Sequence, residues 1–253
     1  MSQLSELNPT TRFSDRVADY VRYRPSYPAA AIDVILEALG DPAALRAADV
    51  GAGTGISARL LADRGLHVVA VEPNVDMQQG AEPHVRVKWQ TGTAEETGLA
   101  DNSVDLVLCA QAFHWFRQPE ALAEFHRILK PAGRLALMWN KRDSRDPFTA
   151  GYRQAIVDVE GESAIEMREY DPGIMERDGL FTPARSFEMP NEQQFDLAGL
   201  IGRATSASYV PKTGERFETL RESLVRLHRE YADLNGTVVL KYITQVYLAG
   251  RIP

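Results

Sequence analysis

Short runs of small and β-branched apolar residues alternate with segments of helical periodicity through the first half of the chain. Strands are expected at 47–50, 67–71, 85–89, 104–110 and 134–139. Helices are expected at 28–39, 56–62 and 119–129, after a short N-terminal helix that Pro25 stops. Because strands joined by crossover helices pair in parallel, the alternation predicts a mostly parallel sheet with helices on both faces.

The second half of the chain has a looser pattern. Residues 147–159 and 215–232 have helical periodicity, and 238–248 alternates like a final strand. Phe187 and Phe195 flank an expected strand-and-turn region. The acidic stretch 160–177 lacks a clear period, and we interpret it as part of a lid or insertion around 145–180.

Composition narrows the class of protein. The 253 residues carry 28 Lys+Arg and 35 Asp+Glu, for a net charge of −7, and 44% are hydrophobic, which is typical of a globular protein. An acidic chain without a Lys/Arg-rich run disfavours binding to nucleic acid. There is no apolar leader and no run of about 18 apolar residues. We therefore expect a cytoplasmic protein that neither spans a membrane nor binds nucleic acid.

Cysteine and histidine offer little metal chemistry. The single cysteine, Cys109, excludes a disulfide framework and a cysteine-ligated zinc site within one chain. The five histidines have no ligand-like spacing, so we predict no metal. The oligomeric state is not indicated by the sequence.

A glycine-rich turn, GAGTG at residues 51–55, follows the first expected strand and opens a helix. Glycine allows a sharp bend and a close approach of the main chain to a ligand. Glu72 ends the second expected strand, where a carboxylate can accept hydrogen bonds from a ribose bound across the strand ends. The dinucleotide fingerprint is GxGxxG, whereas position 56 is Ile. An NAD-type oxidoreductase is therefore an alternative and not the leading hypothesis.

These motifs resemble those of a known family. Asp49–Gly55 followed by Val71–Pro73 looks like motif I and its acidic partner in class I S-adenosylmethionine-dependent methyltransferases. Thr93–Glu95, Asp101–Val107 and Gln111–Phe116 are similar to stretches of the type 11 branch. The YRPSYP sequence at 23–28 resembles a segment of a subgroup that includes trans-aconitate methyltransferase-like proteins. The resemblance covers residues 13–140.

The resemblance implies an α/β fold with a doubly wound, mostly parallel, seven-stranded Rossmann-like sheet in a single domain, 1–253. It implies an N-terminal lid arm at 1–28, a cofactor-binding half at 29–140 and an acceptor-site half at 141–253. S-adenosylmethionine would be the methyl donor, S-adenosylhomocysteine the product, and a small molecule the acceptor.

The resemblance also assigns residues to the cofactor. They are Tyr20, Arg24, Asp49, Gly51, Ala52, Gly53, Thr54, Gly55, Glu72, Pro73, Asn74, Met77, Thr93, Ala94, Glu95 and Gln111. Within this set, Asp49 and the glycines would face the methionine part, and Glu72 would hold the ribose. The adenine side would be formed by Asn74, Met77, Ala94 and Glu95, and Gln111 would close over the methionine end.

The acceptor decides which further residues matter. A phenol, amine or carbon acid must lose a proton before methylation, and His114 is the tentative catalytic base for such an acceptor. A carboxylate is already ionised at neutral pH, and Arg24 or Arg203 would then bind it. We otherwise expect Arg142, Arg145 and Arg203 to be solvent-exposed. A further alternative is a protein that binds the cofactor without turnover.

Overall fold

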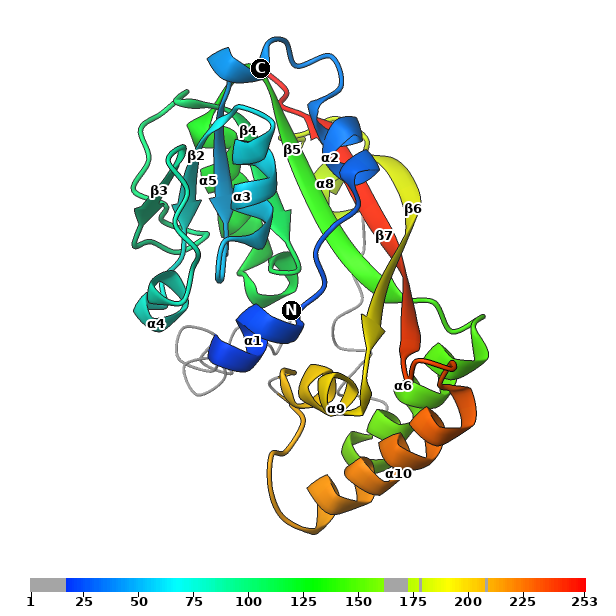
Figure 1. Ribbon diagram of the computed structural model, residues 1–253. Coiled ribbons are helices and arrows are strands. Elements are labelled where there is room, and N and C mark those ends of the chain that lie inside the picture. Colours follow the sequence, from blue (N-terminus) through cyan, green and yellow to red (C-terminus); the bar gives the residue numbers. More distant parts are fainter. Residues whose placement is uncertain (1–16, 162–172, 178, 208) are drawn as a thin grey trace.

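The computed structural model describes residues 17–161, 173–177, 179–207 and 209–253, and these form a seven-stranded sheet in the order β3-β2-β1-β4-β5-β7-β6 (Figure 1). The strands are β1 (Arg46–Val50), β2 (His67–Val71), β3 (Val87–Gln90), β4 (Val104–Ala110), β5 (Leu129–Arg142), β6 (Arg185–Phe195) and β7 (Val238–Gly250). The first five strands pair in parallel, and β7 runs antiparallel to both β5 and β6. The predicted seven-stranded, mostly parallel α/β sheet is confirmed.

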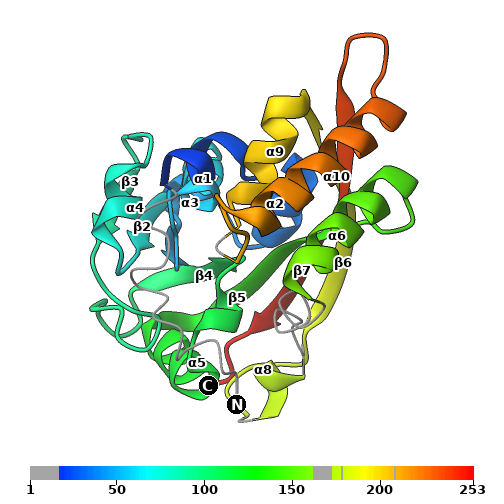
Figure 2. The ribbon, with the colours of Figure 1, turned by 90° about the horizontal axis from the view of Figure 1, so that it is seen from below.

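Helices cover both faces of the sheet. α2 and α3 pack on one face, and α5 and α8 pack on the other (Figures 1 and 2). The helices are α1 (Val17–Tyr23), α2 (Ala29–Leu36), α3 (Ile56–Asp63), α4 (Val75–Gln79), α5 (Gln118–Ile128), α6 (Pro147–Glu160), α8 (Ile174–Arg177), α9 (Leu197–Thr205) and α10 (Glu215–Tyr231), with 3₁₀ turns at Pro42–Ala44 and Phe113–Trp115. Within these described segments, no helix combines the length and apolar character needed to cross a membrane.

The central strands are apolar on both sides because both faces are covered. In β1, Ala47 faces the cluster under α2 and α3, while Ala48 faces the cluster under α5. Both side chains are fully buried. Near-continuous apolar runs are the expected signature of parallel strands packed in this way.

The second half of the chain carries its own small core. β6 and β7 run on past the other strands and carry α6, α9 and α10 beside the lower end of the sheet (Figure 1). A separate apolar cluster joins these elements through Phe148, Tyr152, Leu200, Leu224 and Tyr242. We refer to α6, α9, α10 and the strand ends that they cover as the cap.

Several boundaries differ from the predictions. α2 ends at Leu36, three residues early, and β5 extends beyond the predicted strand at both ends. β6 is one continuous strand where a strand and a turn were expected, because Pro190 lies on the sheet edge, where no partner strand needs its missing N–H. α9 was not predicted. Of the predicted insertion, residues 162–172 lie outside the described part.

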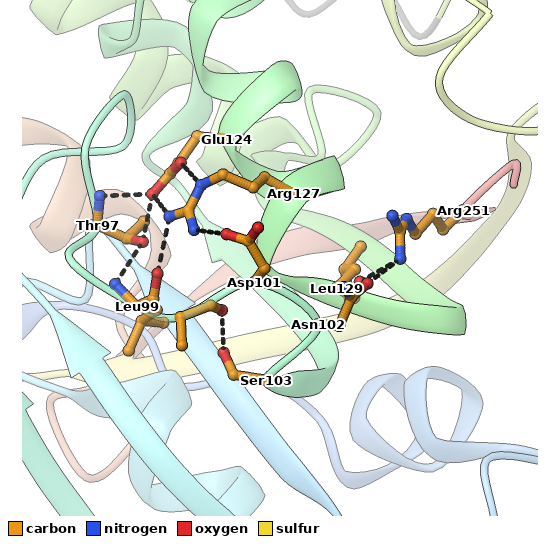
Figure 3. Close-up of polar contacts among 10 residues, drawn as sticks. Thr97, Leu99, Asp101, Asn102, Ser103, Glu124, Arg127, Leu129 and Arg251 are labelled. Carbon is orange, nitrogen blue, oxygen red and sulfur yellow. Dashed lines mark hydrogen bonds and ion pairs between the residues drawn. The ribbon is translucent and has the colours of Figure 1, made fainter.

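Arg127 of α5 fixes the loop between β3 and β4 (Figure 3). Its guanidinium donates to Glu124 at 2.7 and 2.8 Å and to the Leu99 carbonyl at 2.8 Å, and it also contacts Asp101. Glu124 accepts the main-chain N–H of Thr97 at 2.9 Å and its hydroxyl at 2.6 Å. Burial raises the pKa of Glu124, but the hydrogen bonds from Arg127 and Thr97 outweigh it and lower the pKa overall.

Replacing Arg127 should therefore destabilise the fold. Arg127→Met leaves the Glu124 carboxylate and the Leu99 carbonyl short of donors, and we expect the free energy of unfolding to fall by about 2 kcal/mol. Urea denaturation measures it. Arg221→Met on α10, which loses only an exposed pair with Glu218, is the control and should leave the free energy of unfolding nearly unchanged. Equal effects of the two substitutions would contradict the structural role of Arg127.

Candidate functional site

The turn of residues 51–55 lies at the carboxyl end of β1. It packs against the end of β2, where the next loop begins. The main-chain N–H groups of Gly51 and Ala52 both donate to the Val71 carbonyl, at 2.9 and 3.2 Å. A Cβ at Gly51 would lie 2.6 Å from the Cβ of Ala112, so only glycine fits there. Gly53 has φ +57°, a left-handed conformation that glycine adopts at little cost. The turn thus presents closely packed main chain at the strand edge.

Glu72 joins this turn to the loop after β2. Its Oε2 accepts the N–H of Gly53 at 2.8 Å, and its Oε1 accepts the N–H of Asn74 at 2.9 Å. The residue is 8% exposed. Burial raises the pKa of Glu72, while the two main-chain donors oppose that rise. Each carboxylate oxygen has further acceptor capacity, which can take a hydroxyl of a bound sugar.

Asn74 and Met77 follow Glu72 in the chain and lie on the same side of the glycine turn. The Asn74 side chain caps α4 by accepting the N–H groups of Asp76 and Met77 at 2.9 and 3.2 Å. Met77 is buried, and its methyl group lies 3.4 Å from where a Cβ of Gly53 would be. Pro73, between Glu72 and Asn74, is half-buried.

Asp49 lies beneath the turn with one oxygen unused. Its Oδ2 accepts the Ser57 hydroxyl at 2.7 Å, whereas its buried Oδ1 has no hydrogen-bond partner among the described residues. Burial is the main cause that raises the pKa of Asp49 to about 7, and the charge of Glu72 adds to it. The buried Thr54 hydroxyl is likewise unpartnered in this part of the chain. An unpartnered buried carboxylate oxygen suits a cationic ligand.

The loop after β3 holds the next group of predicted residues. Ala94 is buried, and Thr93 accepts the N–H of Glu96 at 3.2 Å. Glu95 accepts the N–H of Arg117 at 2.8 Å, at the start of α5. Sequence reasoning missed this role of Glu95 in fixing the loop to α5. Its role beside an adenine ring stays a prediction.

Gln111 and His114 follow β4. Gln111 has φ +59°, which is uncommon for a residue with a side chain, and its Nε2 donates to the Asn140 carbonyl at 3.3 Å. His114 is buried in the 3₁₀ turn, with its ring centroid 5.2 Å from that of Trp115. The structure brings His114 to the same strand edge as the glycine turn, and its action as a base stays a prediction.

α1 of the N-terminal arm lies between α4 and α9 (Figure 1), which bound the two sides of the site. The Tyr20 hydroxyl lies 3.7 Å from where a Cβ of Gly53 would be. On the other side, a Cβ at Gly202 of α9 would lie 2.3 Å from the Tyr23 ring. The described part of the predicted lid arm therefore bridges the glycine turn and the cap.

Three arginines from distant segments meet where the arm faces the cap. Arg24 follows α1, Arg142 ends β5, and Arg203 lies on α9. Burial is the main cause that lowers the pKa of Arg24, and the charges of Arg203 and Arg142 lower it further. No ion pair joins any of the three to a carboxylate among the described residues. We call this group the arginine cluster.

Aromatic rings and hydroxyls support the arginine cluster. The Arg24 guanidinium lies 4.7 Å from the Tyr20 ring centroid, and that of Arg142 lies 5.1 Å from the Tyr152 ring centroid. Arg203 donates to the Tyr242 hydroxyl at 3.1 Å. Arg24 also donates to the Ser206 carbonyl at 3.2 Å. Rings, hydroxyls and this carbonyl position the cations without neutralising them.

Several donors in the cluster are left over for a ligand. The buried Nε atoms of Arg24 and Arg142 have no hydrogen-bond partner among the described residues. The buried Tyr152 hydroxyl also has no hydrogen-bond partner in this part of the chain. Unsatisfied buried donors on cations are costly, and an anion bound between them would satisfy them.

The expected exposure of two arginines is wrong. Arg203 is 5% exposed, and the Nε of Arg142 is buried. Arg145 is exposed as expected and pairs with Asp143 at 2.7 Å. Sequence reasoning also missed Tyr152 and Tyr242, although their positions on the apolar stripe of α6 and the inward face of β7 were readable from periodicity.

Comparison with known proteins places these features in a family. Residues 48–137 match a family model described as a methyltransferase domain. An uncharacterized methyltransferase of Mycobacterium tuberculosis is 38% identical over 242 residues, covering 92% of each chain. A putative type II methyltransferase from Anaeromyxobacter dehalogenans has a similar structure, with a TM-score of 0.64, 24% identity, and coverage of 90% of this chain and 98% of that one.

A more distant structure was solved with ligands. It is a phosphoethanolamine N-methyltransferase of Haemonchus contortus in complex with phosphomonomethylethanolamine and S-adenosylhomocysteine. The TM-score is 0.57 at 16% identity, and the match covers 98% of this chain and 59% of that one. This likeness concerns the fold.

The buried Asp49 predicts an unusual pH dependence of stability. Its folded pKa of about 7 lies above the unfolded value, so the folded state holds a proton that the unfolded state has lost between about pH 4 and pH 7. The folded state thus loses stability from this group as the pH rises. Asp49→Asn should gain about 3 kcal/mol relative to the wild type between pH 5 and pH 8.

Urea denaturation at the two pH values measures that difference. Asp158→Asn, on an exposed position of α6, is the matched control and should show no such trend. A difference between wild type and Asp49→Asn that does not change with pH would show that Asp49 titrates normally.

Proposed function

The chain belongs to the methyltransferase family and is an S-adenosylmethionine-dependent enzyme, and from this premise we propose that it methylates a small molecule through an ionised carboxylate of that molecule. Family membership contradicts the alternative of an NAD-type oxidoreductase. The arginine cluster carries the proposal, because Arg203 is buried, Arg24 and Arg142 are half-buried with buried Nε atoms, and none of the three has an acidic partner among the described residues. Such a cluster matches an anionic acceptor.

The cofactor would lie along the carboxyl ends of β1 and β2. Glu72 would accept hydrogen bonds from the ribose hydroxyls, and the unpartnered Oδ1 of Asp49 would receive the ammonium group. Met77 would pack beside the adenine. The bound sulfonium supplies an electrophilic methyl group, and the chain's contribution is to orient the two reactants and to exclude water, which can lower a barrier by about 7–11 kcal/mol.

The remaining predicted contacts belong to the same proposal. Main chain of the glycine turn would approach the methionine part, and Gln111 would close that end. On the adenine side, the loop after β3 would contribute Thr93, Ala94 and Glu95, beside Pro73 and Asn74. Tyr20 would lie over the glycine turn as part of the lid arm.

The acceptor would bind under the arm, opposite the glycine turn. Arg24 connects the two halves, because its guanidinium stacks on Tyr20, which itself lies against Gly53. This geometry supports a proposal in which Arg24, predicted as a cofactor residue, contacts the acceptor and Tyr20 lies at the boundary between the two ligands. The YRPSYP segment that contains Arg24 is the part of the chain that resembles the trans-aconitate methyltransferase-like subgroup.

A carboxylate acceptor also agrees with a cluster made of arginines and tyrosines, with no general base among them. Its oxygen is already ionised at neutral pH, so methyl transfer needs no general base. The donors that line the cluster are cations and phenols, which stabilise an anion and do not accept a proton at neutral pH. Under this proposal His114 packs in the wall, whereas a phenol or amine acceptor would require it as the base.

A substrate screen with Arg203→Gln tests the proposal. Mono-, di- and tricarboxylic acids, phenols and amines are supplied with S-adenosylmethionine, and S-adenosylhomocysteine release is measured. We expect turnover of a carboxylic acid, with its KM raised at least tenfold in Arg203→Gln because a charge-assisted hydrogen bond is lost. Affinity for S-adenosylhomocysteine should change less than twofold.

The matched control is Arg145→Gln, an exposed arginine close to Arg142 in sequence, which should behave as the wild type. Turnover of a phenol or amine and of no carboxylic acid would contradict the proposal.

A further inference from the structure

The main chain between Arg24 and Pro28 is held to the sheet by side-chain amides. The Ser26 carbonyl accepts the Nδ2 of Asn140 at 3.1 Å and the Nδ2 of Asn191 at 2.8 Å. Asn140 lies on β5 and Asn191 on β6, so two strands that are not neighbours in the sheet reach the same atom.

A third strand completes this arrangement from between the other two. Thr244 of β7, opposite Asn140 in the register, donates its hydroxyl to the Asn140 Oδ1 at 2.6 Å. Asn191 donates to the same oxygen at 3.1 Å. With its oxygen occupied by two donors, the Asn140 amide must point its nitrogen at Ser26. We call Asn140, Asn191 and Thr244 the asparagine clamp.

The asparagine clamp contributes little to the stability of the sheet. Asparagine is depleted in strands, since its side chain competes with main-chain pairing and adds little packing. The two bonds to Ser26 are exposed, where a hydrogen bond adds little to stability. What these bonds do is fix the position of a segment that belongs to no strand.

The segment held by the clamp carries Arg24. Pro25 and Pro28 stiffen the chain on either side of Ser26, because proline fixes φ and restricts the residue before it. Tyr27 is buried in the core under α2 and α3. The inward Tyr27 side chain and the two amide bonds to the Ser26 carbonyl, from β5 and β6, thus hold the main chain that leads back to Arg24 at adjacent residues.

Register brings the clamp close to the other arginines. Tyr242 of β7 pairs with Arg142 on β5 and with Asn191 on β6, and its hydroxyl accepts from Arg203 at 3.1 Å. Asn191, which binds the Ser26 carbonyl, therefore lies in register with Arg142 and with the tyrosine that binds Arg203. One set of strand ends thus fixes all three arginines relative to one another.

We propose that Asn140 and Asn191 are positioning residues of the acceptor site, which hold the Ser26 main chain so that the Arg24 guanidinium completes the arginine cluster. This inference rests on the proposed function, since it assumes that the cluster binds the anionic acceptor. Neither asparagine touches the acceptor; each acts through Arg24.

Asn191→Ala is the direct test, because it removes both amide bonds of Asn191 and leaves Asn140 in contact with Gln111 of the cofactor side. Citrate serves as the carboxylate probe, titrated calorimetrically into protein saturated with S-adenosylhomocysteine. We expect citrate to bind about tenfold more weakly to Asn191→Ala than to the wild type. Affinity for S-adenosylhomocysteine should stay within twofold.

The control substitution also removes a side-chain bond that involves β6, but at a position away from Ser26. Gln245→Ala removes an exposed bond between β7 and β6, from Gln245 to Glu188 at 2.7 Å, without contact to Ser26. It should leave citrate binding unchanged. An equal loss in Gln245→Ala would show that general weakening of the β6–β7 pairing, and not positioning, is responsible.

A double-mutant cycle with Arg24→Gln separates positioning from mere support. If Asn191 acts through Arg24, Asn191→Ala should have no further effect on citrate binding in the Arg24→Gln background. Additive losses would overturn the inference, as would full citrate affinity in Asn191→Ala alone. In both cases the proposed carboxylate acceptor would stand.

Failure of the proposed function has a different signature. Citrate and the other carboxylic acids of the screen would then fail to bind the wild type, while S-adenosylhomocysteine still binds. That result would remove the anionic acceptor and, with it, the positioning role.

Discussion

One buried carboxylate, that of Glu72, ties the ends of two strands together, and the cofactor side of the site depends on it. Its two hydrogen bonds to the main chain of Gly53 and Asn74 set the spacing of the loops that follow β1 and β2. Asn74 in turn begins α4, and Met77 and Tyr20 lie against the same glycine. A buried carboxylate is tolerated only when hydrogen-bond donors surround it. The two bonds of Glu72 therefore also fix how the two loops lie relative to each other.

The proposed acceptor side differs, because the charges of its arginines have no acidic partner among the described residues. Arg24, Arg142 and Arg203 pack against rings and hydroxyls, with no carboxylate partner in the described part of the chain. Cations held in this way lower the stability of the free protein, and a bound anion offsets that cost. Stability given up at a site in this manner is typical of a site built for a ligand of opposite charge.

The strand, turn and helix that carry the proposed cofactor residues could be predicted from the sequence because their signals are local. A strand, a glycine turn and a helix within twenty residues, then Asn74 before a short helix, are signals that short-range chemistry explains. The arginine cluster could not, because its members come from three distant segments. The burial of Arg203 was missed since Gly199 and Gly202 weaken the helical signal of α9, although Gly202 is what lets the Tyr23 ring approach.

We propose that Glu72 and the glycine turn hold S-adenosylmethionine and its product, S-adenosylhomocysteine. Calorimetric titration of the wild type and Glu72→Gln with S-adenosylhomocysteine tests it most directly, with NADH and ATP as parallel ligands. We expect micromolar binding to the wild type, near −8 kcal/mol, at least tenfold weaker binding to Glu72→Gln, and no binding of NADH or ATP. Unchanged affinity in Glu72→Gln, or binding of NADH in place of S-adenosylhomocysteine, would contradict it.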